Sequence, residues 1–370
     1  MAAAVLGLVA AAPTSAGALT TDNNTPFPTS TAIVAAQWTS PRFDPPPTQY
    51  GDLFPTTWSD DGNVYAVLDD GGLLSTPYHR NYPAKQWREG LVRISGRPPN
   101  VTFHLVGRGD SFGSVYSNGL TSVHGVLYAT RVRLWDWTHF RPFAGLFGIA
   151  YSRDHGQHWS TPNRRFADLA GNLNWVQEGR DRTNSDGFLY AIANDREFNS
   201  SDLYLGRVLP GPPRVTNPSA WQWSNGNTSN GPLWRRSLGL AKPILTWRHR
   251  ITYPRMSYVP GLGRYLLSFS YSYHNDAWPK TFTGGAELDV LEGKHPWGPF
   301  SFVFREPDWG PSNGYAGTFP EKWQSADGRD LWMAWAANWD QAAGGCLAGL
   351  DCSGRYGFNL RSLHLDVAGR

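Results

Sequence analysis

The sequence predicts an all-β protein, and specifically a five-bladed β-propeller, from three observations. Glycine (40 residues) and proline (28 residues) are abundant in the 370-residue chain, aromatic residues reach 14%, and long helical patterns are absent. This composition is typical of short strands joined by many turns. A hairpin-like motif also recurs about every sixty residues, the length of one four-stranded sheet with its loops. The third observation is a propeller-type turn motif at residues 152–159.

The clearest hairpin runs from Gly51 to Gly72. Two stretches rich in aromatic and β-branched residues flank the turn Asp60-Asp61-Gly62-Asn63, where Gly and Asn supply the positive φ of tight turns. Folding the stretch back on Asp61 places Asp52 opposite Asp70, with Cβ atoms roughly 4.5–5.5 Å apart. Two carboxylates so close cannot both ionise freely, so one pKa rises. A glycosidase needs such a pair; the alternative is that both aspartates cap turns.

The repeats predict the blades and the way in which the ring closes. Five copies fill the chain from about residue 31 to residue 367, and Pro210–Leu233 is predicted to be a long surface loop between the third and fourth copies. Residues 31–38 and 359–367 alternate apolar and polar side chains, so we expect the two ends to complete one blade together and remove free edges. The turn glycines of the copies are Gly62, Gly125, Gly187, Gly263 and Gly328.

The stretch Ser152-Arg-Asp154-His-Gly156-Gln-His-Trp159 matches the Asp-box pattern S-x-D-x-G-x-x-W. In such a turn the aspartate accepts backbone N–H bonds, the glycine permits the turn and the tryptophan packs between sheets. The motif is structural, so it supports the fold and does not mark a site.

The N-terminus and the cysteines indicate an exported protein. Residues 1–18 are uncharged and apolar and end in Ala16-Gly17-Ala18, which predicts a signal peptide. Residues 19–30 are predicted to be a disordered lead-in and residues 31–370 the propeller domain, secreted or associated with the cell envelope. No transmembrane segment is expected, because no apolar run is long enough. Cys346 and Cys352 are expected to form one local disulfide.

Charge and motif content narrow the function. The net charge of +3 is small and no Lys/Arg run appears, so we expect no nucleic acid partner. The ten histidines lack H-x-x-x-H spacing and no G-x-S-x-G elbow occurs, so no metal, no cofactor and no acyl-transfer nucleophile are assigned. The chain is expected to be a monomer that acts on a polysaccharide.

Propeller geometry predicts that polar residues of separate blades converge at one end of the channel. Residues before the hairpins and residues about eight positions after each turn glycine should meet there and form a polar pocket suited to a sugar. Each has a structural alternative, such as an ion pair between Asp195 and Arg196 or a lone stabilising role for Arg255. The predicted substrate-binding residues are Trp58, Asn118, Arg133, Glu178, Asp195, Tyr253, Arg255, Tyr271 and Glu321.

Two motifs carry a resemblance to a known family. They are Gly51-Asp52-x-x-Pro55-x-x-Trp58-x-x-Asp61-Gly62-x-x-Tyr65 with Asp69-Asp70-Gly71, and Tyr253-Pro-Arg255-Met-x-Tyr-x-Pro260. The chain after residue 45 resembles exported five-bladed propellers once known only as a domain of unknown function and since tied to endo-D-arabinanase activity (glycoside hydrolase family 183). The resemblance implies catalytic aspartates in the first blade, at Asp52 and Asp70.

The leading hypothesis is an exported glycoside hydrolase that cuts furanoside polymers, with D-arabinan of a cell envelope as substrate. One aspartate would be the general acid, with a raised pKa, and the other the nucleophile, base or pKa-setting partner. The alternatives are an arabinofuranosidase-like or other five-bladed propeller glycosidase, with Glu178 as the acid, and a non-catalytic glycan-binding propeller.

Overall fold

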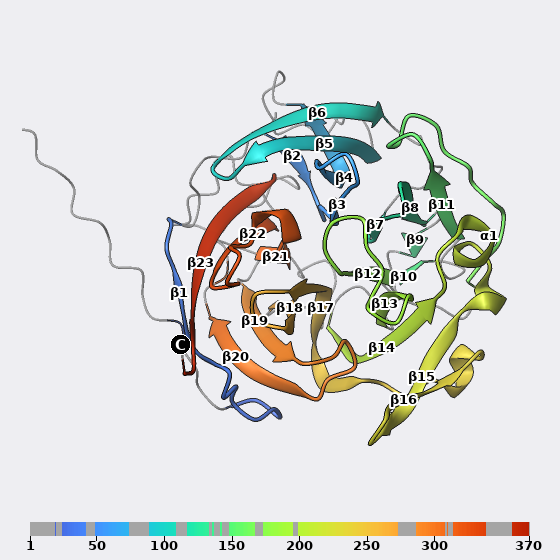
Figure 1. Cartoon of the computed structure of the whole chain (residues 1–370). Coiled ribbons are helices and arrows are strands. Elements are labelled where there is room, and N and C mark those ends of the chain that lie inside the picture. The colour runs from blue at the N-terminus through green and yellow to red at the C-terminus, as the bar shows by residue number, and fades with distance from the viewer. Residues whose placement is uncertain are drawn as a thin grey trace, which may run out of the picture.

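The computed structural model shows a five-bladed β-propeller, with its blades arranged around a central channel (Figure 1). The predicted fold class is therefore confirmed. The structure describes residues 19, 24–41, 49–73, 89–108, 117–132, 135–136, 141–142, 148–166, 173–194, 199–272, 286–307, 309, 314–337 and 357–369.

Blades one and two are built from consecutive antiparallel strands. Blade one contains β2 (Gln49–Asp52), β3 (Thr56–Trp58), β4 (Val64–Leu73), β5 (Glu89–Arg97) and β6 (Asn100–Arg108); β2 and β3 both pair with β4. Blade two contains β7 (Leu120–Val123), β8 (Val126–Arg131) and β11 (Gly148–Ser152), and β9 (Trp135–Asp136) pairs with β10 (Arg141–Pro142) in a separate ribbon.

Blades three and four form one continuous sheet, because their innermost strands pair in parallel at Val176 and Met256. Blade three contains β12 (Leu173–Gln177), β13 (Leu189–Asn194), β14 (Ser200–Val208) and β15 (Gln222–Thr228), which is extended by β16 (Gly231–Arg235). Blade four contains β17 (Leu245–Val259), β18 (Arg264–Ser272), β19 (Ala286–Gly293) and β20 (Phe300–Glu306).

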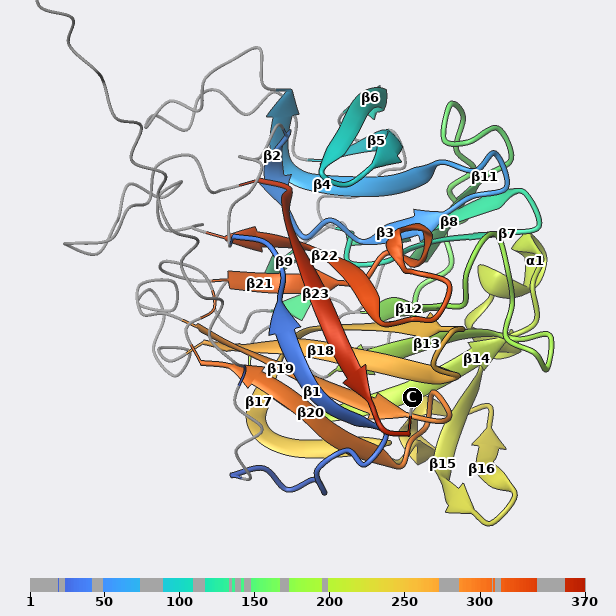
Figure 2. The same cartoon turned by 60° about the vertical axis from the view of Figure 1, so that its left-hand side comes forward.

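Blade five closes the ring with both ends of the chain. It contains β21 (Gly314–Thr318), β22 (Asp330–Ala337), β23 (Asn359–Val367) and β1 (Ile33–Trp38), and β1 pairs antiparallel with β23. Figure 2 shows these two strands side by side. The predicted closure is confirmed, and it covers the edge that β23 would otherwise expose.

The turn glycines have the backbone conformation that the repeat predicts. In all five hairpins between the first and second strands of a blade, the glycine has a φ between 62° and 82°. An L side chain rarely adopts this conformation, which explains why glycine recurs there.

The core lies between the blades. Among the described residues, five clusters of buried apolar side chains join neighbouring blades. The cluster beside the closing blade contains Trp38 and Trp335 on either side of Trp309, with ring centroids 5.6 and 4.3 Å from that of Trp309. Such packing explains most of the tryptophan content without any functional role.

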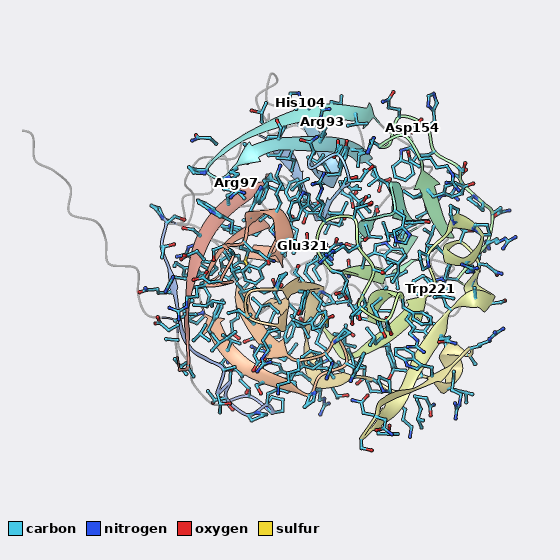
Figure 3. The ribbon with its side chains drawn as sticks, in the orientation of Figure 1. Arg93, Arg97, His104, Asp154, Trp221 and Glu321 are labelled. Carbon is cyan, nitrogen blue, oxygen red and sulfur yellow. The ribbon has the colours of Figure 1, made fainter. Side chains whose placement is uncertain are left out.

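The Asp-box turn is confirmed as a structural element of blade two. Asp154 accepts the Ser152 hydroxyl at 2.7 Å and the His158 backbone N–H at 2.9 Å, and the Trp159 indole donates to the Gly156 carbonyl at 3.0 Å. The labelled Asp154 lies at the periphery of the ring (Figure 3).

Two expectations about irregular segments are wrong. The predicted lead-in is ordered near its end, because Ser30 donates its backbone N–H to the Phe302 carbonyl and Phe302 donates to the Pro28 carbonyl. The predicted loop after Pro210 instead begins with two short helices, α1 (Pro212–Val215) and η2 (Pro218–Ala220). The β15–β16 hairpin follows, and then η3 (Leu238–Leu240). Residues 1–18 lie outside the described part of the chain.

Candidate active site at the mouth of the central channel

The channel has two distinct ends. Each blade begins with a hairpin whose first strand runs along the channel to the turn glycine and whose second strand returns. We call the end where β2, β7, β12 and β21 begin the mouth, and the end that carries the turn glycines the far end (Figure 2). A residue's place in its hairpin therefore decides which end it faces.

Asp52 is the carboxylate that the structure places at the mouth. It is the last residue of β2 and is half-buried, and its Oδ2 accepts a hydrogen bond from the Tyr315 hydroxyl of blade five at 3.0 Å. A phenol hydrogen bond favours the charged form of a carboxylate. Asp52 is thus held by the neighbouring blade and still reaches solvent.

The backbone around Asp52 is strained. Leu53 and Phe54, which follow it, have φ values of 62° and 35°, and Tyr253 in blade four and Ala316 in blade five have 47° and 54°. These left-handed conformations are unfavourable for residues with a side chain and persist only where the surroundings enforce them. Strain of this kind clusters at functional sites, which supports the mouth as the candidate site.

The predicted pairing of Asp52 with Asp70 is wrong by one residue. Gln49 and Tyr50 pair with Leu73 and Gly72, as the turn at Asp61 predicts, but Asp52 pairs with Asp69. The cause is a β-bulge between Tyr50 and Asp52, which changes the register locally. Asp70 lies in β4, but its side chain falls outside the description, so its catalytic role stays a prediction.

Sequence reasoning missed two buried acids in blade one. Asp69 and Glu89 are opposite each other in β4 and β5, and both are fully buried. Asp69 turns toward blade two, where its Oδ2 accepts the backbone N–H of Ser117 at 3.3 Å. The adjacent acidic pair Asp69-Asp70 in the sequence could have pointed to Asp69, whereas no local sequence feature pointed to Glu89.

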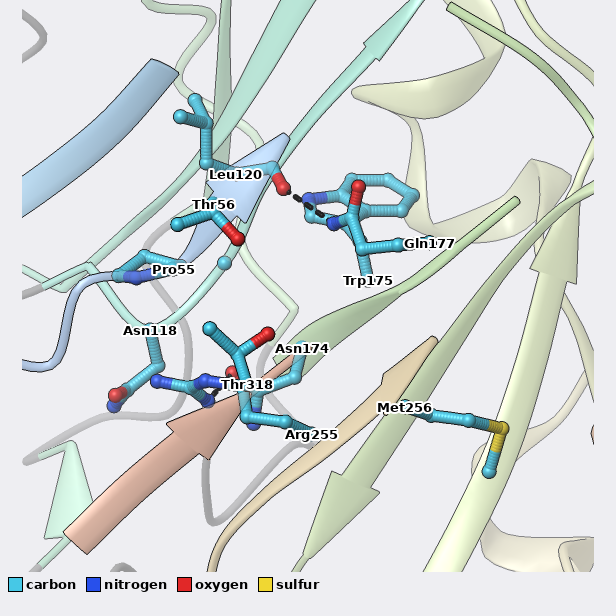
Figure 4. Close-up of a pocket in the computed structure, with 11 residues that line it drawn as sticks. Pro55, Thr56, Asn118, Leu120, Asn174, Trp175, Gln177, Arg255, Met256 and Thr318 are labelled. Carbon is cyan, nitrogen blue, oxygen red and sulfur yellow. Dashed lines mark hydrogen bonds between the residues drawn. The ribbon is translucent and has the colours of Figure 1, made fainter. Parts of the chain in front are cut away.

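Below the mouth, the channel encloses a small cavity lined by the innermost strands of all five blades (Figure 4). Asn118 and Arg255, two predicted residues, line it together with Asn174, which was not predicted. The Arg255 guanidinium donates to Asn174 Oδ1 and, at 3.1 Å, to the Leu53 carbonyl. Burial lowers the pKa of Arg255 to about 10, so the group is cationic at neutral pH.

Two predicted tyrosines lie in blade four. Tyr253 is buried, and its ring centroid lies 5.5 Å from that of Tyr315, so it supports the side chain that holds Asp52. Tyr271 is half-buried near the end of β18, with the Arg250 guanidinium 4.1 Å from its ring centroid. The second contact is a cation–π interaction, so the guanidinium covers that face of the ring.

Glu178 and Glu321 do not join this group, which corrects the prediction that they converge with Asp52. Trp58, which was predicted to bind substrate by stacking on a sugar, does not join it either. Glu178 follows the end of β12, Glu321 begins η5 (Glu321–Trp323) after β21, and Trp58 ends β3, so all three lie toward the far end. Glu178 and Glu321 were assigned to the mouth because the alignment of repeats did not separate the start of an innermost strand from its end.

The far end holds buried acids. Glu178 accepts hydrogen bonds from Asn184 Nδ2 at 2.9 Å and from the Tyr265 hydroxyl at 3.0 and 3.2 Å, and burial raises its pKa to about 7. Within the described residues, neither oxygen of Glu321 has a hydrogen-bond partner. Burial, and then the charge of Glu178, raise the pKa of Glu321 to about 8. Figure 3 shows Glu321 near the centre of the ring.

Four predicted residues lie outside the described part of the chain: Arg133, Asp195, Cys346 and Cys352. Their roles, including the disulfide, stay predictions.

One group of side chains in the described residues has ligand atoms close enough to hold a metal ion. Asp60, Asp61 and His155 offer such atoms within 4.8 Å of one another at the far end of blade one. Asp60 already bonds to the His155 ring at 2.7 Å, and Asp61 accepts from Asn63 and from the Tyr65 hydroxyl at 2.9 Å. These bonds account for the cluster as a turn structure.

The fold has known counterparts among solved structures. A Bacteroides ovatus protein whose hydrolase description is provisional matches with a TM-score of 0.51 and 13% identity, over 89% of this chain and 90% of that one. This likeness shows the fold alone.

Two further matches have lower TM-scores. An α-L-arabinofuranosidase from Podospora anserina, solved with cellotriose, has a TM-score of 0.48 and 10% identity, over 92% of this chain and 98% of that one. A GH43_1 enzyme from Xanthomonas citri has a TM-score of 0.47 and 11% identity, over 87% and 90%. No protein-family model and no curated protein matches the chain. In the described part, no helix has the length and apolar character to span a membrane.

Proposed function

We propose that this protein is an exported glycoside hydrolase that cleaves a furanoside polysaccharide, acting within chains of D-arabinan. The observation that carries the proposal is Asp52: a carboxylate on strained backbone, held by Tyr315 and open to solvent at the mouth of a propeller channel. Below the mouth, the polar side chains of Asn118, Asn174 and Arg255 from three other blades line the channel, which suits the binding of a sugar chain.

The chemistry divides between two carboxyl groups. In this proposal the hydrogen bond from Tyr315 favours the ionised form of Asp52, which suits a base or nucleophile. The second group, which protonates the leaving oxygen, is Asp70, the partner that the family resemblance implies. Asp69 is fully buried and turned toward Ser117, so it is a poorer candidate for contact with a substrate.

The runner-up assignment of the acid to Glu178 has less support. Its carboxyl group has a raised pKa of about 7, as a general acid would need, but it is buried behind Asn184 and Tyr265 toward the far end. The general acid must reach the same glycosidic bond as the base or nucleophile. Glu178 and Asp52 lie toward opposite ends of the channel.

The experiment is a screen of the full chain against polysaccharides that include D-arabinan, L-arabinan, xylan and galactan, with analysis of product lengths. The proposal expects oligosaccharides of mixed length from D-arabinan. Release of single arabinose units would instead indicate an arabinofuranosidase. Binding without cleavage, retained in the Asp52→Asn variant, would indicate a glycan-binding propeller and overturn the proposal.

A further inference from the structure

Arg255 ties three blades together inside the central cavity. It lies in β17 of blade four and is only 5% exposed. Its guanidinium donates to the Leu53 carbonyl of blade one at 3.1 Å, to Asn174 Oδ1 of blade three, and to the carbonyl of its own neighbour Pro254 at 3.3 Å. Such burial leaves little of the side chain for contact with a substrate.

The bond to Leu53 acts on the residue next to the candidate catalytic carboxylate. Leu53 has a φ of 62° and is buried, and its conformation sets the direction in which the chain leaves Asp52. A left-handed leucine persists only where its surroundings hold it. A charged donor makes a stronger hydrogen bond than a neutral one, and the planar guanidinium fixes its direction.

The charge of Arg255 also acts on the acids of blade one. Burial lowers its pKa, while the negative charge of Asp69 opposes that shift, so Asp69 lies within electrostatic reach of the guanidinium. By reciprocity the cation favours the ionised form of a carboxylate nearby. The effect is screened little, because Arg255 is only 5% exposed.

We propose that Arg255 is a positioning residue for the hydrolytic reaction: it holds the Leu53–Phe54 turn that orients Asp52, and it places a buried cation against the residue that follows Asp52. The proposal rests on the proposed function for its kinetic consequences, but its structural consequence does not depend on activity.

The kinetic test compares Arg255→Met, which removes the charge and both interblade bonds, with Arg255→Lys, which retains the charge alone. For Arg255→Met we expect kcat on D-arabinan to fall about 10²-fold with KM little changed, as for a displaced catalytic group. The acidic limb of the pH–rate profile of this variant should move to higher pH, because a carboxylate without the cation has a higher pKa. For Arg255→Lys, kcat should fall less and the limb should stay near its wild-type position.

The matched control is Arg264→Met in the same blade. Arg264 pairs with Glu292 at 3.0 Å, beside the turn at the far end. Its loss should leave kcat and the acidic limb unchanged. A wild-type kcat in Arg255→Lys together with an unshifted limb in Arg255→Met would overturn the proposal. If Arg255→Met does not fold, a wild-type kcat in Arg255→Lys is by itself enough to overturn the proposal.

A second measurement separates this proposal from the proposed function. The Asp52 carboxyl pKa is read by ¹³C NMR titration in the wild type and in Arg255→Met, with Asp52→Asn used to assign the signal. A higher Asp52 pKa in Arg255→Met supports the positioning role, even if the wild type cleaves no polysaccharide. The absence of cleavage by the wild type would overturn only the proposed function. An unchanged Asp52 pKa would overturn the positioning role.

Discussion

The two ends of the central channel carry acids in opposite environments. At the mouth, Asp52 reaches solvent and accepts a hydrogen bond from Tyr315. Toward the far end, burial raises the pKa of Glu178 to about 7 and that of Glu321 to about 8. Acidic residues that look equivalent in the sequence therefore lie in different environments, because burial raises the pKa of the far-end carboxyl groups whereas solvent reaches Asp52.

The largest effect is expected at the mouth. Asp52→Asn should reduce hydrolysis of D-arabinan by roughly 10²–10⁴-fold, the usual contribution of a positioned acid or base. The thermal midpoint should be unchanged or slightly higher, since the amide oxygen can still accept from Tyr315. Assays of reducing ends alongside calorimetry check both expectations. Near wild-type cleavage by Asp52→Asn would show that the catalytic residues lie elsewhere and that the two ends of the channel do not differ in function.

A smaller effect is expected when the support of Asp52 is removed. Tyr315→Phe deletes a hydrogen bond to a charged group, which contributes about 1.5–3 kcal/mol, so kcat/KM should fall at least roughly tenfold. The Asp52 pKa should rise without the donor, and the acidic limb of the pH–rate profile should move to higher pH. A profile identical to that of the wild type would show that Tyr315 does not tune Asp52.

At the far end, Glu321→Gln should change stability and not activity. The carboxyl group ionises near its ordinary value of 4.5 in the unfolded chain and near 8 in the folded chain. The folded state is therefore destabilised progressively as pH rises from about 4.5 to 8. The glutamine variant should lose that dependence and have a thermal midpoint several degrees higher at pH 8.

Thermal unfolding of both proteins between pH 4.5 and 8 checks the Glu321 expectation. A parallel pH dependence in the two proteins would contradict the raised pKa. A loss of hydrolysis in Glu321→Gln would return the far end to the list of catalytic candidates.

The smallest effect is expected at the periphery. Asp154→Asn removes the acceptor charge of the Asp-box turn, where Asp154 receives the Ser152 hydroxyl and the His158 N–H. Because the group is largely exposed, we expect a loss of at most about 1 kcal/mol of unfolding free energy. Denaturant titration measures this loss of unfolding free energy. Wild-type hydrolysis by the same variant would show that the turn aspartates, unlike Asp52, have no catalytic role.

How far the sequence could predict the site depends on the residue. Asp52, Asn118 and Arg255 were assigned to the mouth and lie in or beside it, because each stands at a recognisable place before a hairpin. Glu178 and Glu321 were misplaced, because no sequence signal separates the start of a short innermost strand from its end. Glu89 was missed, because the pairing of Asp52 with Asp69 and of Asp69 with Glu89 across neighbouring strands connects it to the site.

The amino-acid sequence by itself determined the features that depend on short-range chemistry. These are the left-handed turn glycines, the Asp-box turn, the recurring hairpins and the complementary terminal strands. The tertiary structure alone decided the bulge that pairs Asp52 with Asp69, the bond from Arg255 to Leu53 and the end of the channel at which each acid lies. These features depend on contacts between residues far apart in the chain, and only closure of the ring brings those residues together.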